Sequence, residues 1–104
     1  MSVPLHSDYS FCGPVALIAF TGELEVTTAP RAGAQLIALI EAGAREILVD
    51  LNEVEFMGSA GIGVLDEAAR AVAARGGRLY VFRAAAQPRR AIEYAQMPVR
   101  VGLV

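Results

Sequence analysis

Short apolar runs alternate along this chain with segments in which apolar residues recur at helical spacing. Three of the runs, at residues 15–20, 46–51 and 78–82, are too short for helices and lie close to glycine residues. We therefore expect three buried strands. Weaker patterns at residues 7–11 and 99–104 predict an edge strand before the first of them and a short strand after the last.

Three helical segments separate these strands. They are expected from about residue 28 to Gly43, from Ser59 to Gly76, and over residues 86–95. Thr27 or Thr28 can accept a hydrogen bond from a free amide at the first helix start, and Pro30 fits a first turn. The apolar stripes comprise Ala32, Leu36, Leu39 and Ile40 in the first helix, and Ile62, Leu65, Ala69 and Val72 in the second. Asp66 and Arg70, four residues apart, should pair on the other side of the second helix.

The order of elements predicts an α/β fold. Strands that alternate with helices require a mixed, mostly parallel sheet, here of four to five strands with about three helices and right-handed crossovers. The 104 residues predict a single domain over residues 1–104, with a weak or disordered N-terminus over about residues 1–8. Hydrophobic residues make up 55% of the chain, which is enough for a core.

Charge and cysteine content exclude several kinds of site. The net charge is −2, and no run of like charges exceeds two residues, so binding to nucleic acid through a basic patch is not expected. Cys12 is the single cysteine and His6 the single histidine, which argues against a disulfide and a metal site. No leader opens the chain, and no apolar run approaches the roughly 20 residues that span a bilayer, so we expect a cytoplasmic protein without membrane contact.

Enzyme motifs are also lacking. Gly58, Gly61 and Gly63 precede a helix as in a phosphate loop, but the acid of the dinucleotide fingerprint is replaced by Arg78 and Leu79, and the chain has no lysine for a P-loop. No histidine follows the only serine near this loop, so that serine has no base. We predict no catalytic residues, no cofactor and no metal.

Two carboxylates and a serine remain near the loop that we expect after residue 51. Glu53 and Glu55, beside Asp50, are interpreted as surface carboxylates. Ser59 stands at the start of the second helix, and two interpretations stay open. It either caps the helix, worth about 1 kcal/mol, or it accepts a phosphate whose charge of about −1.5 to −2 lies at the positive end of the helix dipole.

Three segments carry a resemblance to a known family. Residues 21–30 (TGELEVTTAP), 49–51 (VDL) and 56–65 (FMGSAGIGVL) resemble the STAS domain, and more narrowly the bacterial anti-sigma factor antagonists. The resemblance covers about residues 15–97. It implies a STAS-like fold and a role in transcription regulation through partner switching, in which a cytoplasmic antagonist binds an anti-sigma factor that is also a serine kinase.

The resemblance also implies the site. The kinase would phosphorylate Ser59, the phosphoprotein would release its partner, and a phosphatase would reset it. The implied partner-binding residues are Gly22, Glu23, Glu25, Thr27, Gly58, Ser59, Ala60 and Gly61. The family usually has an aspartate where this chain has Gly58. A STAS domain that does not switch, as a docking subunit of a transporter or a signalling scaffold, is the alternative, and a homodimer is left open.

Overall fold

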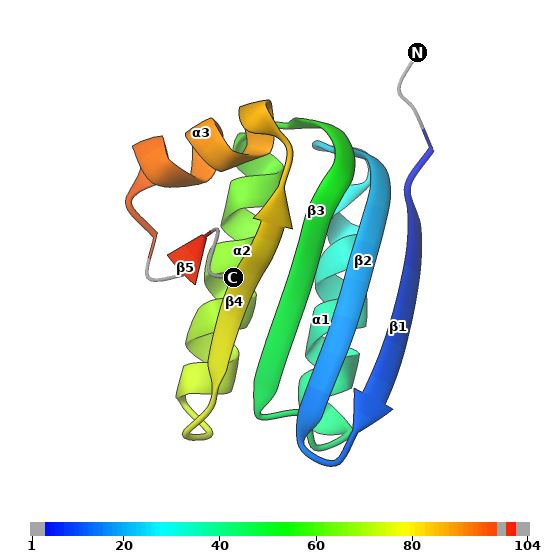
Figure 1. Ribbon diagram of the computed structural model, residues 1–104, viewed down its shortest axis with the longest axis vertical. Helices are drawn as coiled ribbons and strands as arrows, with labels where there is room; N and C mark the ends of the chain where they lie inside the picture. Colours follow the sequence, from blue (N-terminus) through cyan, green and yellow to red (C-terminus); the bar gives the residue numbers. More distant parts are fainter. Residues whose placement is uncertain (1–3, 98–99, 102–104) are drawn as a thin grey trace.

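The computed structural model describes residues 4–97 and 100–101 and shows one five-stranded sheet with three helices (Figure 1). In chain order the elements are β1 (His6–Cys12), β2 (Val15–Leu24), α1 (Ala29–Glu41), β3 (Glu46–Met57), α2 (Ser59–Ala73), β4 (Arg78–Ala84), α3 (Ala86–Ala95) and β5 (Arg100–Val101). The remainder of the strand expected at residues 99–104 lies outside the described residues.

The strand order in the sheet follows the order in the chain. β1 is antiparallel to β2, and every other neighbouring pair is parallel. The predicted mixed, mostly parallel α/β sheet is therefore confirmed. α1 and α2 lie side by side on one face of the sheet, and α3 lies at the end where β3 and β4 finish (Figure 1). No helix in the described residues is long and apolar enough to cross a membrane.

The core lies between the sheet and these two helices. The predicted stripe of α1 is buried, and in α2 Leu65, Ala69 and Val72 are buried while Ile62 is half-buried. On the opposite face of β2, Leu17 is 39% exposed, although parallel sheets are usually covered on both faces. The Arg70 Nε–Asp66 Oδ2 distance is 3.0 Å, which confirms the expected ion pair on α2.

β3 is longer than the sequence suggested. We expected a loop after Leu51, but the strand continues to Met57. The buried residues Ile47, Val49 and Leu51 are two apart, whereas Leu51, Val54 and Met57 are three apart. The pairing of β3 with β2 shifts twice in this stretch, and at each shift β3 carries one extra residue. These β-bulges remove the alternation that identifies a strand, so the predicted loop was wrong.

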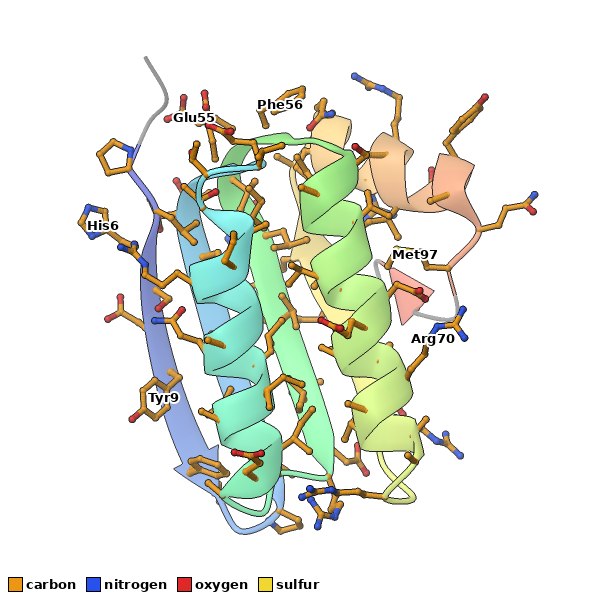
Figure 2. The ribbon with its side chains drawn as sticks, turned by 180° about the vertical axis from the view of Figure 1, so that it is seen from behind. His6, Tyr9, Glu55, Phe56, Arg70 and Met97 are labelled. Atoms are coloured by element: carbon orange, nitrogen blue, oxygen red, sulfur yellow. The ribbon has the colours of Figure 1, made fainter. Side chains whose placement is uncertain are left out.

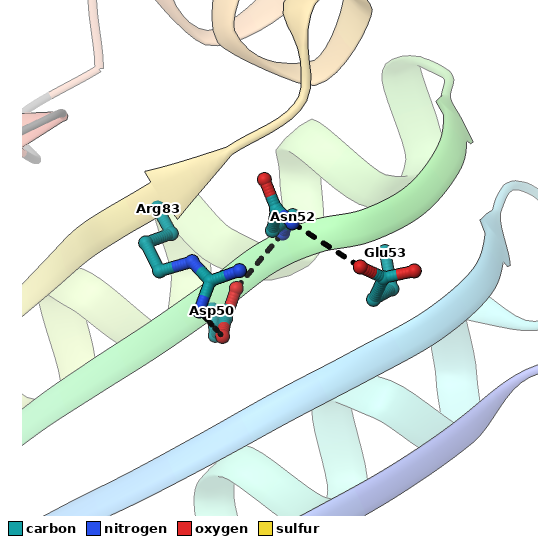
Figure 3. Close-up of polar contacts among 4 residues, drawn as sticks. All are labelled: Asp50, Asn52, Glu53 and Arg83. Atoms are coloured by element: carbon teal, nitrogen blue, oxygen red, sulfur yellow. Dashed lines mark hydrogen bonds and ion pairs between the residues drawn. The ribbon is translucent and has the colours of Figure 1, made fainter.

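The first bulge is stabilised by side chains from two strands (Figure 3). Asp50 Oδ1 accepts a hydrogen bond of 2.9 Å from the backbone amide of Asn52, and the side-chain Nδ2 of Asn52 donates one of 3.1 Å to Glu53 Oε2. Arg83 Nη1 on β4 lies 3.7 Å from Asp50 Oδ2. Asp50 is thus a structural carboxylate at the bulge. Glu53 and Glu55 are exposed, as expected of surface residues.

The chain is ordered earlier than expected at its N-terminal end. β1 begins at His6, and Leu5 is buried, whereas the sequence suggested weak order to about residue 8. The Arg31 guanidinium donates to the carbonyl of Leu5. A Cβ built at Gly22, whose φ is +116°, would lie 2.1 Å from the carbonyl oxygen of Pro4. Gly22 therefore allows residues 4 and 5 to pass against β2.

Candidate functional site

Ser59 lies at the surface, two residues after the end of β3 at Met57. It is the first residue of α2, and Gly58 occupies the N-cap position with φ −95° and ψ −174°. Within the part of the chain that the structure describes, no side chain makes an N-cap hydrogen bond to this helix. The interpretation of Ser59 as the helix cap is therefore wrong, because its hydroxyl stands one residue too late in the helix. The side chain is exposed and is not held by a capping role.

Gly58 is not required by the backbone conformation at this position. Its φ is one that any residue adopts. A Cβ there would lie 3.3 Å from Cε2 at the edge of the Phe56 ring, which is the end of a movable side chain. Phe56 itself is 45% exposed and lies with Glu55 at the end of β3 (Figure 2). A larger N-cap residue would require only a small movement of the Phe56 ring.

Leu24, in the segment 21–30, contacts Gly58 and Gly61 in the segment 56–65, although Leu24 and Gly58 are 34 positions apart in the chain. Its carbonyl accepts a 2.9 Å hydrogen bond from the amide of Gly58. A Cβ built at Gly61 would lie 2.9 Å from both Cβ and O of Leu24, so the missing side chain lets α2 approach the end of β2. The connection between β2 and α1 is in this way placed beside the first turn of α2.

Thr28 organises that connection. Its hydroxyl donates a 2.7 Å hydrogen bond to the carbonyl of Glu23 and accepts one of 3.0 Å from the amide of Glu25. Thr28 occupies the N-cap position of α1, but its side chain does not cap that helix. The Glu25 carboxylate also accepts a 3.3 Å hydrogen bond from the amide of Thr27. Thr28 thus stabilises the turn from Glu23 to Thr27 instead of the helix that follows.

The predicted partner-binding residues differ in exposure. Ser59 and Thr27 are exposed; Glu23, Glu25, Gly58 and Ala60 are half-buried; and Gly22 and Gly61 are buried. Two exposed apolar side chains that are not among these predicted residues stand at the same end of the molecule. Val26 is 74% exposed in the connection after β2, and Phe56 is the second. We call Val26, Thr27, Phe56, Gly58 and Ser59 the Ser59 surface.

A groove of about 300 Å³ continues from Ser59 along α2. Its lining residues are Ser59, Ile62, Gly63, Asp66, Arg70, Ala95, Gln96 and Met97. α2 forms one wall and the turn after α3 the other, with Arg70 and Met97 on opposite sides (Figure 2). The first turn of α2 contains no acidic residue, so the positive end of its dipole is not compensated there. Next to the Ser59 hydroxyl, a partner therefore finds apolar side chains in the groove and the positive end of the α2 dipole.

Gln87 fixes the end of β3 directly before this site. Its Oε1 accepts a 2.8 Å hydrogen bond from the amide of Met57, and its Nε2 donates one of 3.0 Å to the Met57 carbonyl. Sequence reasoning assigned residue 87 only to a helix start. The paired residues are thirty positions apart, and no local pattern indicates such a contact.

We expect Gln87→Ala to loosen the backbone before Ser59. Each lost hydrogen bond is worth about 0.5–1.5 kcal/mol, so the amide of Met57 should exchange with solvent up to about tenfold faster. Hydrogen exchange followed by NMR measures this effect, with the amide of Val49 in the middle of the same strand as the reference. Equal acceleration at Met57 and Val49 would mean that Gln87 has no local effect.

Comparisons with known proteins show to which family this chain belongs. The model of the STAS domain family matches residues 10–99. The fold is similar to the anti-sigma factor antagonist SpoIIAA in its unphosphorylated form, with a TM-score of 0.81, 17% identity, and coverage of 94% of this chain and 89% of that one. An anti-sigma factor antagonist from Mycobacterium paratuberculosis gives a TM-score of 0.76 at 22% identity, over 96% and 90% of the two chains.

A third similar structure is the Bacillus cell fate determinant SpoIIAA in its phosphorylated form. Its TM-score is 0.74 at 17% identity, with coverage of 94% of this chain and 92% of that one. A comparison with curated protein sequences finds no match. At these identities the solved structures establish the fold, and the family match covers most of the chain. The chain belongs to the STAS domain family.

Proposed function

We propose that this protein is an anti-sigma factor antagonist that binds an anti-sigma factor with serine kinase activity. In this proposal the kinase transfers the γ-phosphoryl group of ATP to the hydroxyl oxygen of Ser59, with ADP as the leaving group and release of the hydroxyl proton. The modified protein then leaves its partner, and a phosphatase restores the hydroxyl. The observation that carries the proposal is the exposed Ser59 at the first position of α2, with no cap that needs its hydroxyl.

The position of Ser59 allows a phosphate to act on a partner without unfolding the domain. A dianion at a helix N-terminus is stabilised by about 0.3–1 kcal/mol by the dipole and the free amides. A partner packed over the same residue would have to desolvate this charge or accommodate its bulk. The expected result is a large change in affinity with little change in stability.

The Ser59 surface has the composition of a docking site. Val26 and Phe56 can serve as apolar contacts, and Glu23, Glu25 and Thr27 can supply polar contacts around them. Ala60 lies beside Ser59 in the same first turn. Gly22 and Gly61 are buried and would contribute by letting neighbouring segments approach, because they have no side chain to offer a partner.

In this role the protein is a kinase and phosphatase substrate and has no catalysis of its own. Partner binding and phosphorylation take place in the cytoplasm, where sigma factors act, and they require contact with neither nucleic acid nor a membrane. Similarity to SpoIIAA, whose structures include an unphosphorylated and a phosphorylated form, supports this proposal.

Phosphorylation of Ser59 is expected to weaken partner binding by about tenfold or more, equivalent to about 1.4 kcal/mol. The full chain is used as bait to isolate the partner, which is then incubated with the chain and ATP. Intact mass should increase by one phosphate, and calorimetric titration should give the two affinities. The Ser59→Ala variant should bind but gain no phosphate, whereas Ser10→Ala, which changes an exposed serine on β1, should still be modified.

A charge control separates local repulsion from net charge. Ser59→Glu should weaken binding, whereas Ala73→Glu, about 21 Å away along α2 at 1.5 Å per residue, should not. Unfolding of the phosphorylated protein in urea should differ from that of the unmodified form by less than about 1 kcal/mol. Failure of the isolated kinase to modify wild-type protein would contradict the proposal.

The STAS docking subunit that does not switch remains the second candidate because of Gly58. This glycine leaves α2 without a side-chain cap and removes the negative charge that the family usually carries beside the serine. Capture of a transporter subunit, with binding unchanged by Ser59→Glu, would favour this function. Comparison of Gly58→Asp with the wild-type protein then tests the effect of this residue directly, because aspartate readily adopts the φ and ψ angles that Gly58 has at the N-cap position.

A further inference from the structure

The outer strand β1 has one free edge over seven residues, His6–Cys12. Its only neighbour among the described strands is β2. Exposed edges are normally protected by lysine, proline, bulges or a covering segment, because their backbone groups can pair with another chain. β1 contains neither lysine nor proline, and its register with β2 runs without a shift.

The tight turn after β1 determines which backbone groups face the free edge. Gly13, with φ +60°, and Pro14 form a two-residue turn between Cys12 and Val15. In a hairpin with such a turn, the two flanking residues, here Cys12 and Val15, are a hydrogen-bonded pair. Such pairs alternate along antiparallel strands. The amides and carbonyls of Ser7, Tyr9 and Phe11 therefore point away from β2 and are available to a further strand.

We propose that a second copy of this chain occupies this edge, with the two β1 strands antiparallel about a two-fold axis at Tyr9. In this register Tyr9 lies opposite Tyr9 of the second copy, and Ser7 lies opposite Phe11. The pair of Ser7 and Phe11 occurs twice, once on each side of the axis, so there are three facing pairs. Each pair exchanges two hydrogen bonds, so six form in total and every outward backbone group of these residues is used. The two sheets become one continuous sheet.

Charge and the number of hydrogen bonds favour this register over its two neighbours. A two-fold axis at Asp8 would place that carboxylate directly opposite its own copy, which is unfavourable. An axis at Ser10 would leave only the pairs between Tyr9 and Phe11, with four hydrogen bonds. With the axis at Tyr9, Asp8 faces Ser10 and His6 faces Cys12, so no like charges are directly opposed.

The side chains on the helix side of this edge are also incompletely covered. Tyr9 is 65% and Phe11 41% exposed, and their rings meet edge to face with centroids 6.5 Å apart. Both line an apolar groove of about 300 Å³ between β1 and α1, together with Leu39 and Ala42. Figure 2 shows Tyr9 at this edge, beside α1. In the dimer the aromatic residues of each copy lie against those of the other and cover the open side of the groove.

The dimer edge is distinct from the Ser59 surface. β1 lies at one edge of the sheet (Figure 1), whereas the Ser59 surface is formed by the connection after β2 and by the junction of β3 and α2, and it includes no residue of β1. The proposal therefore does not depend on the proposed function of Ser59, and two partners can bind one dimer.

Sedimentation equilibrium of the full chain tests the association, which should be weak, with a Kd on the order of 100 µM for so small an interface. Tyr9→Lys puts two like charges at the axis and should raise the Kd more than tenfold. The matched control is Tyr94→Lys, which changes an exposed tyrosine on α3 and should leave dimerisation unchanged. Far-UV circular dichroism checks that both variants are folded.

Disulfide cross-linking between two copies tests the proposed register. In the proposed pairing position 6 faces Cys12 of the second copy at a Cα separation of about 4.5 Å, which suits a disulfide. Within one chain the same positions are about 20 Å apart along the strand and cannot be bridged. His6→Cys should therefore oxidise to a covalent dimer, whereas wild-type protein and Ala73→Cys should not.

Several results would each overturn the proposal. They are a monomer up to about 1 mM, dimerisation of Tyr9→Lys equal to that of wild type, and cross-linking of His6→Cys no greater than that of Ala73→Cys. Dimerisation lost in Tyr94→Lys alone would equally overturn it, because the interface would then lie at α3.

Discussion

Leu65→Ala is expected to lower the free energy of unfolding by about 2–5 kcal/mol. Leu65 is 1% exposed and lies on the buried stripe of α2 against the sheet. Truncation removes the transfer free energy of the side chain and leaves a cavity, which surrounding strands cannot close without moving. Urea unfolding followed by circular dichroism measures the change.

The open face of the sheet provides the control for this prediction. Leu17→Ala removes the same atoms from β2, where the side chain is 39% exposed. Its expected cost is below about 1 kcal/mol, because little apolar surface returns to water and no closed cavity forms. Equal losses for the two variants would show that Leu65 does not belong to the core.

Two glycines in the first turns of α2 are expected to respond to alanine in opposite directions. At Gly61 a Cβ would lie 2.9 Å from the carbonyl oxygen of Leu24 and 3.1 Å from Cγ of Met57. The Leu24 oxygen is backbone and cannot rotate away, so Gly61→Ala should destabilise the fold by about 1–2 kcal/mol. At Gly63, apart from the adjoining residues and the backbone of the helix itself, no atom of the described residues lies within 4 Å of the new Cβ. Gly63→Ala should therefore stabilise the fold by about 0.5–1 kcal/mol through helix propensity.

The free energies of unfolding of the two variants should thus differ by about 1.5–3 kcal/mol, although the substituted positions are two residues apart in one helix. Thermal and urea unfolding of both proteins measure the difference. Stabilisation by Gly61→Ala would contradict the close approach of α2 to Leu24. A crystal structure of Gly61→Ala should show the first turn displaced from the end of β2.

The sequence predicted the architecture because its periodic signals are local. The α1 stripe at Leu36, Leu39 and Ile40 is buried as expected, and α3 occupies residues 86–95 as predicted. Each of these patterns is visible within a few residues. They were sufficient to place the sheet, the helices and Ser59 at the start of α2.

The remaining features depend on contacts between distant residues. The bulges of β3 arise from pairing with β2, so residues 52–57 show no alternation and suggested a loop. Thr28 has a residue type and position typical of a cap, but its hydroxyl finds partners at Glu23 and Glu25. Gln87 reaches Met57 across thirty residues. Local propensity cannot reveal such tertiary contacts.

The bulges of β3 have a consequence for sequence alignment among distant relatives. Each bulge adds a residue to β3 while β2 keeps its own count, so the chain length between Leu51 and Met57 is not dictated by the neighbouring strand. A relative that lacks one of these residues could still place its equivalents of Leu51 and Met57 in the core. Gaps inside this strand should therefore be accepted when remote homologues are aligned, even though gaps are normally confined to connecting segments.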